Sequence, residues 1–366
     1  MYGVALIGTG RVGYQFSFGE LPDNHAEAVA ATEGLRLVAG VNRGRDKLEA
    51  FGQRFGVDAL FHDYRQMLEQ AAPEIVIVAT HPELHCEMVV DCAAAPSVRA
   101  IICEKPMALS LEECDRMIAA CERAGVLLQV NHNRRWNPHW IQAQRLLAAG
   151  AIGELNYIHC YMDGCKPTPA WRSANEGPLL HDFSHYFDLL DLFAGEPAWL
   201  CGMAEQRSRP WAVEDFSAAF VKFASGVTGI VHGAELSDYE NHAFLLSGST
   251  GVIRMQGERV HLSRSNPGDV EPDSGFAWRE LAEAPVERPA PASTYCAALD
   301  ELLDALDGTG TLRSDGRVGR RSLEVIMAIY QSQLEGNRPV SFPLTMAGSG
   351  VAALRAAGHF AERGDE

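Results

Sequence analysis

Positive charge is scarce in this chain of 366 residues. Lys and Arg together number 31 against 48 Asp and Glu, which gives a formal net charge of −17 at pH 7. Nucleic-acid binding needs surplus Lys and Arg to neutralise phosphates, and adsorption to an anionic membrane surface needs the same surplus. We therefore expect neither a nucleic-acid partner nor a membrane partner.

Long apolar runs and paired cysteines are missing as well. No apolar run approaches the roughly 18 residues of a membrane-spanning helix, and the first residues lack the basic segment of a secretory signal. The nine cysteines include no Cys-x-x-Cys pair, and their odd number fits reduced thiols better than a disulfide framework. These absences predict a cytoplasmic protein. The length is comfortable for two domains with sizeable cores.

The first third of the chain alternates short apolar runs with segments of helical periodicity. The apolar runs predict strands at Val4–Ile7, Leu37–Val41, Ile75–Ala79, Ala100–Cys103 and Val126–Val130. The periodic segments predict helices at Ala26–Thr32, Arg45–Phe55, Tyr64–Gln70, Glu83–Ala94 and Leu111–Ala124. This alternation predicts an α/β domain over residues 1–130, a doubly wound parallel sheet of the Rossmann type with helices on both faces.

After about residue 131 the pattern changes. Helices are expected at Pro138–Ala149, from His181 to Phe193, at Ser293–Leu306 and at Val318–Leu334. Strands are expected at Leu155–Tyr161, Ala218–Phe223, Val227–His232, Phe244–Ser247 and Val252–Met255, with turn signals between the later ones. Asn266–Pro291 has the composition of a surface excursion. We expect a second, α+β domain over residues 131–366 with a large, mostly antiparallel sheet.

A glycine motif, Gly8-Thr9-Gly10-Arg11-Val12-Gly13, follows the first predicted strand. In a dinucleotide-binding loop the first glycine makes the turn, and the second lets the backbone approach a pyrophosphate at a helix N-terminus. The spacing alone is a weak signal, and its position after the first strand strengthens it. The alternative is a glycine-rich turn that binds nothing.

The acidic residue that usually follows the second strand of such a domain is absent, and Asn42-Arg43 stands in its place. A carboxylate there would bind the ribose 2′-hydroxyl of NAD and repel a 2′-phosphate. Asn42 tolerates the phosphate, and Arg43 or Arg45 can bind it. The sequence therefore favours NADP, or use of both cofactors. The alternative is that both arginines are solvated and NAD is used.

Glu104-Lys105-Pro106 follows the predicted strand Ala100–Cys103. Open α/β sheets bind their ligands at the carboxyl ends of the strands. A lysine placed there can hydrogen-bond a substrate oxygen and stabilise developing alkoxide charge. An isolated Lys105 would be an ordinary surface residue.

Two histidines, His181 and His185, are four residues apart and share one face if they lie on one helix. Such a pair can transfer protons or bind a metal. A third ligand at metal-binding spacing is not evident, so no metal is expected. A packed structural histidine is the other alternative, and it suits His181 better than His185.

These residues, in this order, resemble the Gfo/Idh/MocA oxidoreductase family of glucose–fructose oxidoreductase and inositol dehydrogenase. The resemblance runs from Val4 to about Pro343. It rests on the glycine loop and on Ala79-Thr80-His81-Pro82-Glu83-Leu84-His85, Glu104-Lys105-Pro106, Arg134-Arg135-Trp136-Asn137-Pro138, Trp171-Arg172, His185–Asp188 and Val340-Ser341-Phe342-Pro343-Leu344.

The resemblance implies site residues. Lys105 corresponds to the family's catalytic lysine, which polarises the substrate oxygen. His185 corresponds to its catalytic histidine, which takes the hydroxyl proton as hydride leaves for nicotinamide C4. His181 is a third catalytic candidate. Contacts to the cofactor are expected from Gly8, Gly10, Arg11, Val12, Gly13, Asn42, Arg43, Thr80, His85, Glu104 and Lys105. Contacts to the substrate are expected from Lys105, Asn133, Trp171, Arg172, His181, Asp182 and His185.

Three departures from the family pattern stand out. The position four residues before the catalytic histidine is often Asp and here is His181, with Asp182 beside it. The usual Gly-Gly before this helix is Gly177-Pro178. The segment Tyr14–Asn24 is an insertion that can line the site or change assembly.

The sequence thus predicts a cytoplasmic NAD(P)-dependent dehydrogenase or ketoreductase acting on a sugar, cyclitol or sugar derivative. One rival is a redox-neutral glycoside-cleaving or epimerising enzyme that retains its cofactor. The other is a non-catalytic cofactor or sugar sensor, against which the presence of Lys105 and His185 argues. Because the family's open sheet often forms its oligomer interface, we expect a homodimer or homotetramer.

Overall fold

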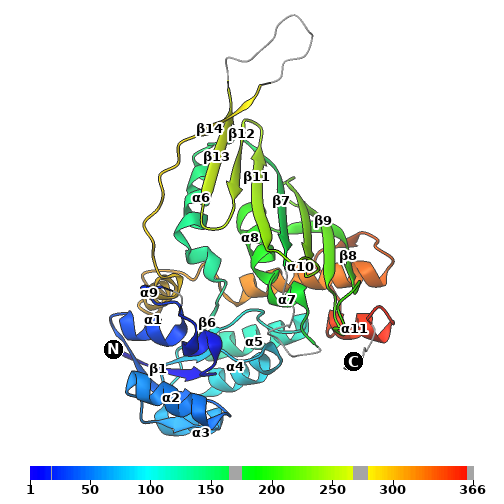
Figure 1. Cartoon of the computed structure of the whole chain (residues 1–366). Coiled ribbons are helices and arrows are strands. Elements are labelled where there is room, and N and C mark those ends of the chain that lie inside the picture. Colours follow the sequence, from blue (N-terminus) through cyan, green and yellow to red (C-terminus); the bar gives the residue numbers. More distant parts are fainter. Residues whose placement is uncertain (18, 165–174, 267–278, 361–366) are drawn as a thin grey trace, which may run out of the picture. The chain divides into compact units, whose positions relative to one another are not determined.

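The computed structural model of the chain describes residues 1–17, 19–164, 175–266 and 279–360 (Figure 1). The chain forms two compact units, each with its own sheet. The first unit combines Met1–Asn137 with Ala292–Glu324, and the second combines Pro138–Pro291 with Val325–Glu366.

The first unit contains a six-stranded sheet in the order β3-β2-β1-β4-β5-β6, with every neighbouring pair parallel. Its strands are β1 (Tyr2–Ile7), β2 (Leu35–Val41), β3 (Leu60–Phe61), β4 (Ile75–Val78), β5 (Ala100–Cys103) and β6 (Leu127–Val130). The five predicted strands and the Rossmann architecture are confirmed. The two-residue β3 was not predicted, because two residues carry no periodic pattern.

Helices cover both faces of this sheet. They are α1 (His25–Ala31), α2 (Arg45–Phe55), α3 (Tyr64–Ala71), α4 (His85–Ala94) and α5 (Leu111–Ala124), with short helical turns at η1 (Arg11–Gln15), η2 (Pro82–Leu84) and η3 (Asn133–Trp136). The strands are buried on both sides: Val4 and Leu6 face one layer of helices, and Ala5 and Ile7 face the other. This two-sided burial explains why the strands read as continuous apolar runs.

The bounds of α5 follow from its end residues. Ser110 precedes the helix, and its hydroxyl accepts a hydrogen bond from the Glu113 N–H at 3.3 Å. The Glu113 carboxylate accepts the Leu109 N–H in return, so the amides at the start of the helix are satisfied. Gly125 ends the helix with a φ of 67°, a conformation that glycine adopts without steric cost.

The predicted domain boundary differs from the structure, because residues 131–137 and Ala292–Glu324 belong to the first unit. A helix late in the sequence, α9 (Thr294–Leu306), belongs to the first unit, although everything after residue 131 was assigned to the second domain. Its apolar face supplies Leu299 and Leu302 to the cluster that contains Val4 and Leu6. Periodicity identifies this helix correctly, but it cannot show which sheet the apolar face covers.

The second unit contains a nine-stranded sheet in the order β14-β13-β12-β11-β7-β10-β9-β8-β15. All neighbours are antiparallel except β7 and β10, so the expected mostly antiparallel sheet is confirmed. Its strands are β7 (Leu155–Asp163), β8 (Pro197–Glu205), β9 (Phe216–Phe223), β10 (Thr228–Ala234), β11 (Asn241–Gly248), β12 (Gly251–Met255), β13 (Val260–Ser265), β14 (Leu281–Ala284) and β15 (Val340–Ser341). The segment expected as a surface excursion contributes β14 to this sheet.

The helices assigned to this unit are α6 (Pro138–Ala148), α7 (Pro178–His181), α8 (Ser184–Ala194) and α11 (Gly350–Ala356), and the long α10 (Gly316–Leu334) contributes its second half. The single helix predicted from His181 to Phe193 is wrong. Two helices stand there, separated at Asp182 and Phe183. The break lets Phe183 point into the core, where its ring lies directly over Gly233 of β10.

The contact between Phe183 and Gly233 predicts a size limit at residue 233. A Cβ atom on Gly233 would overlap the Phe183 ring, so Gly233→Ala should lower the free energy of unfolding by about 1–3 kcal/mol, the usual cost of overpacking. Urea denaturation of the full chain measures this loss.

The matched control is Gly229→Ala, four residues earlier on the same strand. Its nearest neighbour is Phe223 Cε2 at 3.1 Å, which a small side-chain movement can relieve. Equal denaturation midpoints for the two variants would contradict the proposed packing role of Gly233.

Candidate functional site

One edge of the parallel sheet collects most of the predicted site residues of the first unit. Because the six strands are parallel, their carboxyl ends lie at the same edge. The glycine loop follows β1, Thr80 follows β4, Lys105 follows β5 and Asn133 follows β6. The structure therefore brings the predicted dinucleotide loop, the lysine and one predicted substrate contact to the same edge.

The glycine loop has the geometry that a dinucleotide requires. Gly8 has a φ of 103°, and a Cβ there would overlap the carbonyl of Ala79 on the neighbouring strand. A Cβ on Gly13 would overlap the carbonyl of Gly8. Gly10 has no heavy atom within 4 Å of its Cβ position. Two glycines are thus needed for packing, and the third leaves the backbone open to an approaching ligand.

The helix that should follow this loop is interrupted. Residues Arg11–Gln15 form a single π-helical turn, and helix α1 begins only at His25, after the predicted insertion. The opening amides of a helical turn have no partner within the turn, so they remain suited to bind an anion. Arg11 lies over the ring of Phe16, 4.6 Å from its centroid, at the mouth of the loop.

The insertion is anchored to the first unit by specific contacts. Tyr14 is buried edge-on against Phe51 and Phe55 of α2. The Asn24 side chain donates to the carbonyl of Phe16 at 2.7 Å, and its oxygen caps α1 at the Glu27 N–H. The insertion thus rejoins the fold at the first residue of α1.

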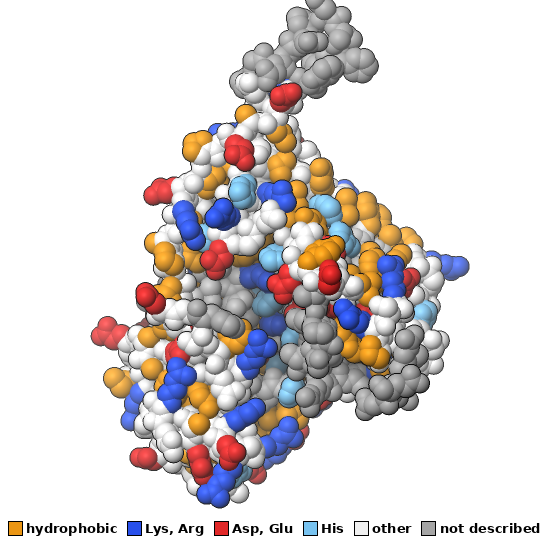
Figure 2. Space-filling view, in the orientation of Figure 1, with side chains coloured by type: hydrophobic (Ala, Val, Ile, Leu, Met, Phe, Trp, Pro, Cys, Tyr) orange, Lys and Arg blue, Asp and Glu red, His pale blue; other side chains and the backbone are white. Residues whose placement is uncertain are grey.

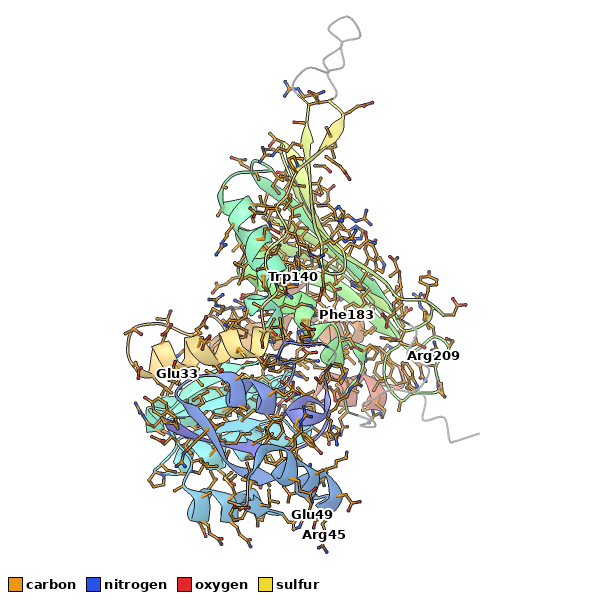
Figure 3. The ribbon with its side chains drawn as sticks, turned by 60° about the vertical axis from the view of Figure 1, so that its left-hand side comes forward. Glu33, Arg45, Glu49, Trp140, Phe183 and Arg209 are labelled. Atoms are coloured by element: carbon orange, nitrogen blue, oxygen red, sulfur yellow. The ribbon has the colours of Figure 1, made fainter. Side chains whose placement is uncertain are left out.

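The polar residues after β2 occupy the place where a ribose carboxylate is usual. Asn42 accepts the Gly44 N–H through Oδ1 at 2.8 Å, so its amide NH₂ remains the group that can donate to a ligand. Arg43 is exposed. Arg45 and Glu49, both on α2, form an exposed ion pair at 2.6 Å that points away from the unit (Figure 3).

Glu104 is the centre of a buried polar cluster in the first unit. Its Oε1 accepts hydrogen bonds from His25 Nε2 at 2.7 Å and Asn131 Nδ2 at 2.6 Å, and its Oε2 accepts the Lys105 N–H at 3.2 Å. The Tyr295 ring packs edge-on against His25. Burial by itself would raise the pKa of the Glu104 carboxyl, but the interactions with His25, the hydrogen bond from Asn131 and the charge of Lys105 together outweigh burial and lower that pKa.

Like Glu104, His85 holds parts of the first unit together through its hydrogen bonds. His85 is fully buried, and its ring nitrogens face the carbonyl oxygens of Thr80 and Pro106, each at 3.1 Å. Burial lowers the pKa of His85, which favours the neutral ring. The ring therefore joins the loop after β4 to the loop after β5. Both residues were predicted as cofactor contacts, yet their polar atoms are turned toward the protein.

The second unit carries the predicted histidines. His181 ends α7, and His185 lies in the first turn of α8. His181, Asp182 and His185 are all partly exposed. Because Lys105 lies in the first unit and the histidines in the second, their catalytic pairing stays a prediction. Trp171 and Arg172, two predicted substrate contacts, lie outside the described residues.

Three residues that sequence reasoning missed surround the short helix α7. Glu176 is buried and accepts a hydrogen bond from His181 Nδ1 at 2.8 Å. Glu214 is also buried, and it accepts the Leu179 N–H at 2.9 Å and the Tyr330 hydroxyl at 3.0 Å. No sequence signal links these positions, because Glu214 and Tyr330 are far from α7 along the chain.

The environment of Glu214 perturbs its titration. Burial raises the pKa of this carboxyl to about 7, although its hydrogen bonds with Leu179 and Tyr330 act in the opposite direction. The group therefore keeps its proton well above the pH range in which an exposed carboxyl releases it.

Within the described part of the chain, no group of three or more His, Cys, Asp or Glu side chains could hold a metal ion. No helix in that part is long and apolar enough to cross a membrane.

Comparison with known proteins identifies the family. Residues 2–132 match an oxidoreductase family described as having an NAD-binding Rossmann fold, and residues 140–254 match the GFO/IDH/MocA C-terminal domain. The chain belongs to the Gfo/Idh/MocA oxidoreductase family. The family resemblance predicted from its motifs is thereby confirmed, and the chain is an NAD-binding oxidoreductase.

Several relatives in this family cover most of the chain. A D-apiose dehydrogenase of Paraburkholderia graminis is 28% identical over 326 residues, which are 86% of this chain and 85% of that protein. A scyllo-inositol 2-dehydrogenase (NAD(+)) of Bacillus subtilis is 26% identical and covers 75% of this chain and 81% of its own length. The WlbA dehydrogenase of Chromobacterium violaceum, solved with NADH and UDP-GlcNAcA, matches with a TM-score of 0.78 at 25% identity, over 94% of this chain and 97% of that chain.

The raised pKa of Glu214 predicts a stability change with pH. The unfolded carboxyl releases its proton near its ordinary value of 4.5, whereas the folded one keeps it up to about 7. Glu214 therefore lowers the free energy of unfolding progressively as pH rises through this window. Glu214→Gln cannot ionise, so its stability relative to wild type should increase by about 2–3 kcal/mol between pH 5 and pH 8.

Urea denaturation of both proteins at pH 5 and pH 8 measures this difference. The control is Glu205→Gln, since Glu205 is much more exposed and forms an ion pair with Arg207. A pH-independent difference between Glu214→Gln and wild type would show that the Glu214 carboxyl does not titrate in this range.

Proposed function

We propose that this protein is an NAD(P)-dependent dehydrogenase or ketoreductase acting on a secondary hydroxyl of a sugar, cyclitol or sugar derivative. The observation that carries the proposal is the placement of Lys105 at the same sheet edge as the open backbone of Gly10. The curated relatives act on apiose and scyllo-inositol, which supports a polyhydroxylated substrate.

The proposed chemistry divides between two side chains. When bound, a nicotinamide dinucleotide supplies the hydride acceptor or donor. Lys105 donates a hydrogen bond to the reacting oxygen and stabilises the charge that develops on it. His185 accepts the hydroxyl proton during oxidation and returns it during reduction. His181 is the third member of the proposed site, and Asn133 and Asp182 are proposed substrate contacts.

The residues of the first unit also support a choice of cofactor. We infer that Asn42 and Arg43 accept a 2′-phosphate, so that NADP is used at least as well as NAD. Arg43 is exposed, and the Asn42 amide group presents a donor where a carboxylate is usual. Arg45 contributes less, because Glu49 already pairs with its guanidinium.

Self-association through the open sheet is a further part of the proposal. Tyr157, Ile230 and Phe220 lie on three neighbouring strands and are 45%, 42% and 41% exposed. Trp199 adds its ring 5.8 Å from Phe220. In Figure 2 hydrophobic side chains gather over the region where Figure 1 labels β8 and β9. A homodimer or homotetramer would cover this face.

A cytoplasmic location fits the cysteines. Six of them, Cys86, Cys92, Cys103, Cys114, Cys121 and Cys160, are buried free thiols. Free thiols of this number suit a reducing compartment.

The proposed chemistry predicts product and kinetics together. Dialysed protein given a productive sugar or cyclitol and excess NAD(P)⁺ should release one equivalent of free NAD(P)H and a keto product. Lys105→Met and His185→Ala should each lower kcat by about 10²–10⁴, as expected for losing a positioned charge-stabilising or acid–base group. Absorbance at the nicotinamide band and mass spectrometry measure both outcomes.

The matched controls are Lys47→Met and His261→Ala, which alter exposed residues outside the proposed site. Substrate conversion without added cofactor and without net absorbance change would replace the dehydrogenase by the redox-neutral enzyme. Near-normal turnover in His185→Ala would remove its assigned role. Cofactor and sugar binding without any chemistry would favour the sensor.

The cofactor proposal predicts a specific loss in one variant. Titration calorimetry should show NADP(H) binding at least as tightly as NAD(H) to the wild-type protein. Arg43→Ala should weaken NADP(H) about tenfold or more, since it removes a charge-assisted bond to the phosphate, and should leave NAD(H) nearly unchanged. Strong preference for NAD(H) that persists in Arg43→Ala would overturn the proposal.

A further inference from the structure

Glu176 is a buried carboxylate that the proposed chemistry does not yet use. Its side chain is 2% exposed, whereas the side chain of His181, its hydrogen-bond partner, is 29% exposed. The 2.8 Å contact joins Glu176 Oε1 to His181 Nδ1. A buried acidic group therefore holds one edge of a ring whose remainder reaches the surface of the second unit.

This contact determines where the imidazole proton lies. A carboxylate accepts hydrogen bonds, so Nδ1 must carry the proton that it donates to Glu176. In the neutral ring, Nε2 then bears the lone pair and accepts hydrogen bonds. In the family that this chain resembles, the position of His181 is often Asp, whose carboxylate would also present an acceptor. In its neutral form, His181 held by Glu176 also presents an acceptor, and this acceptor lies farther from the residue's own backbone than a carboxylate of Asp would.

The backbone next to Glu176 is held in place by the side chain of Glu214. A Cβ on Gly177 would overlap the Glu214 carboxylate, so the chain packs directly against that side chain. Glu214 also accepts the Leu179 N–H, and Tyr330 donates to the same oxygen of Glu214. The His181 N–H donates to the Gly177 carbonyl at 2.9 Å. Residues 176–181 thus have fixed positions, as a residue that orients another must have.

We propose that Glu176 is a positioning residue that holds His181 in the Nδ1–H tautomer, so that Nε2 accepts a hydrogen bond from a hydroxyl of the substrate. This inference rests on the proposed function for the identity of the substrate. The assignment of the tautomer rests on the contact between Glu176 and His181 alone. The hydroxyl in question is a second one, distinct from the hydroxyl whose proton His185 accepts.

The tautomer can be measured without turnover. Long-range nitrogen–proton correlation spectra of the full chain, labelled at the imidazole nitrogens and recorded at pH 8.5, distinguish Nδ1–H from Nε2–H rings. The His181 signals are assigned by their loss in His181→Asp. We expect the Nδ1–H form in the wild type and a shift toward Nε2–H in Glu176→Gln, whose amide can donate to Nδ1. Glu205→Gln, which changes a partly exposed carboxylate paired with Arg207, is the control and should leave the His181 tautomer unchanged.

Kinetics test the contact with the substrate. For a sugar that the wild type oxidises, Glu176→Gln should raise KM about 3–10-fold, the range for one neutral hydrogen bond, with a smaller change in kcat. In the His181→Asp background the same change should have no further effect, because Glu176 acts through the ring. One monodeoxy analogue of the sugar should show equal KM values in wild type and Glu176→Gln.

The outcomes separate this inference from the proposed function. An unchanged His181 tautomer in Glu176→Gln, or an Nε2–H ring in the wild type, overturns the role of Glu176 even if the enzyme is an active dehydrogenase. Equal KM increases for the sugar and for all its deoxy analogues reduce Glu176 to a structural residue. Absence of hydride transfer in a wild type with the expected tautomer overturns the proposed function and leaves the positioning of His181 intact.

Discussion

The site residues of the first unit depend on the hydrogen bonds that the Glu104 carboxylate accepts. A buried carboxylate is costly unless its charge is compensated, and here His25, Asn131 and the Lys105 N–H provide three donors. The three donors come from different elements: His25 from the start of helix α1, Asn131 from the residue after β6, and Lys105 from the second residue after β5. The cluster therefore fixes the backbone of Lys105 relative to the strand ends.

Each unit buries a carboxyl group near predicted site residues, and the surroundings of the two carboxyl groups differ. In the first unit a carboxylate buried behind Lys105 is stabilised in its charged form by His25. In the second unit Glu214 accepts hydrogen bonds from the Leu179 amide and the Tyr330 hydroxyl, and burial, with a smaller contribution from the negative charge of Asp215, raises its pKa. The first arrangement favours a permanent negative charge beside a cation. The second arrangement permits a carboxyl that changes its charge near neutral pH and that contacts α7, the helix that ends at His181.

Much of the parallel sheet could be predicted, because buried strands and glycine turns leave local patterns in the sequence. Strand β5 and helix α5 match their predicted bounds, and the place of Lys105 follows from those bounds. What failed was non-local: the break at Phe183 depends on the absent side chain of Gly233 in a distant strand. The partners Glu214 and Tyr330 were missed for the same reason, whereas Glu176 lies only five residues before His181 and was missed because no motif marks it. His85 was predicted as a cofactor contact from a motif, but its ring faces carbonyl oxygens.

The discontinuity of the first unit has a consequence for its synthesis. Helix α9 supplies Leu299 and Leu302 to a core that otherwise consists of residues near the N-terminus, including Val4 and Val29. During synthesis on the ribosome, α9 can cover this core only after about residue 306 has emerged. Most strands of the nine-stranded sheet have been made by then. The part of the nascent Rossmann core that α9 covers thus stays exposed for most of translation. A chaperone that shields apolar surface would find its longest-lived target there.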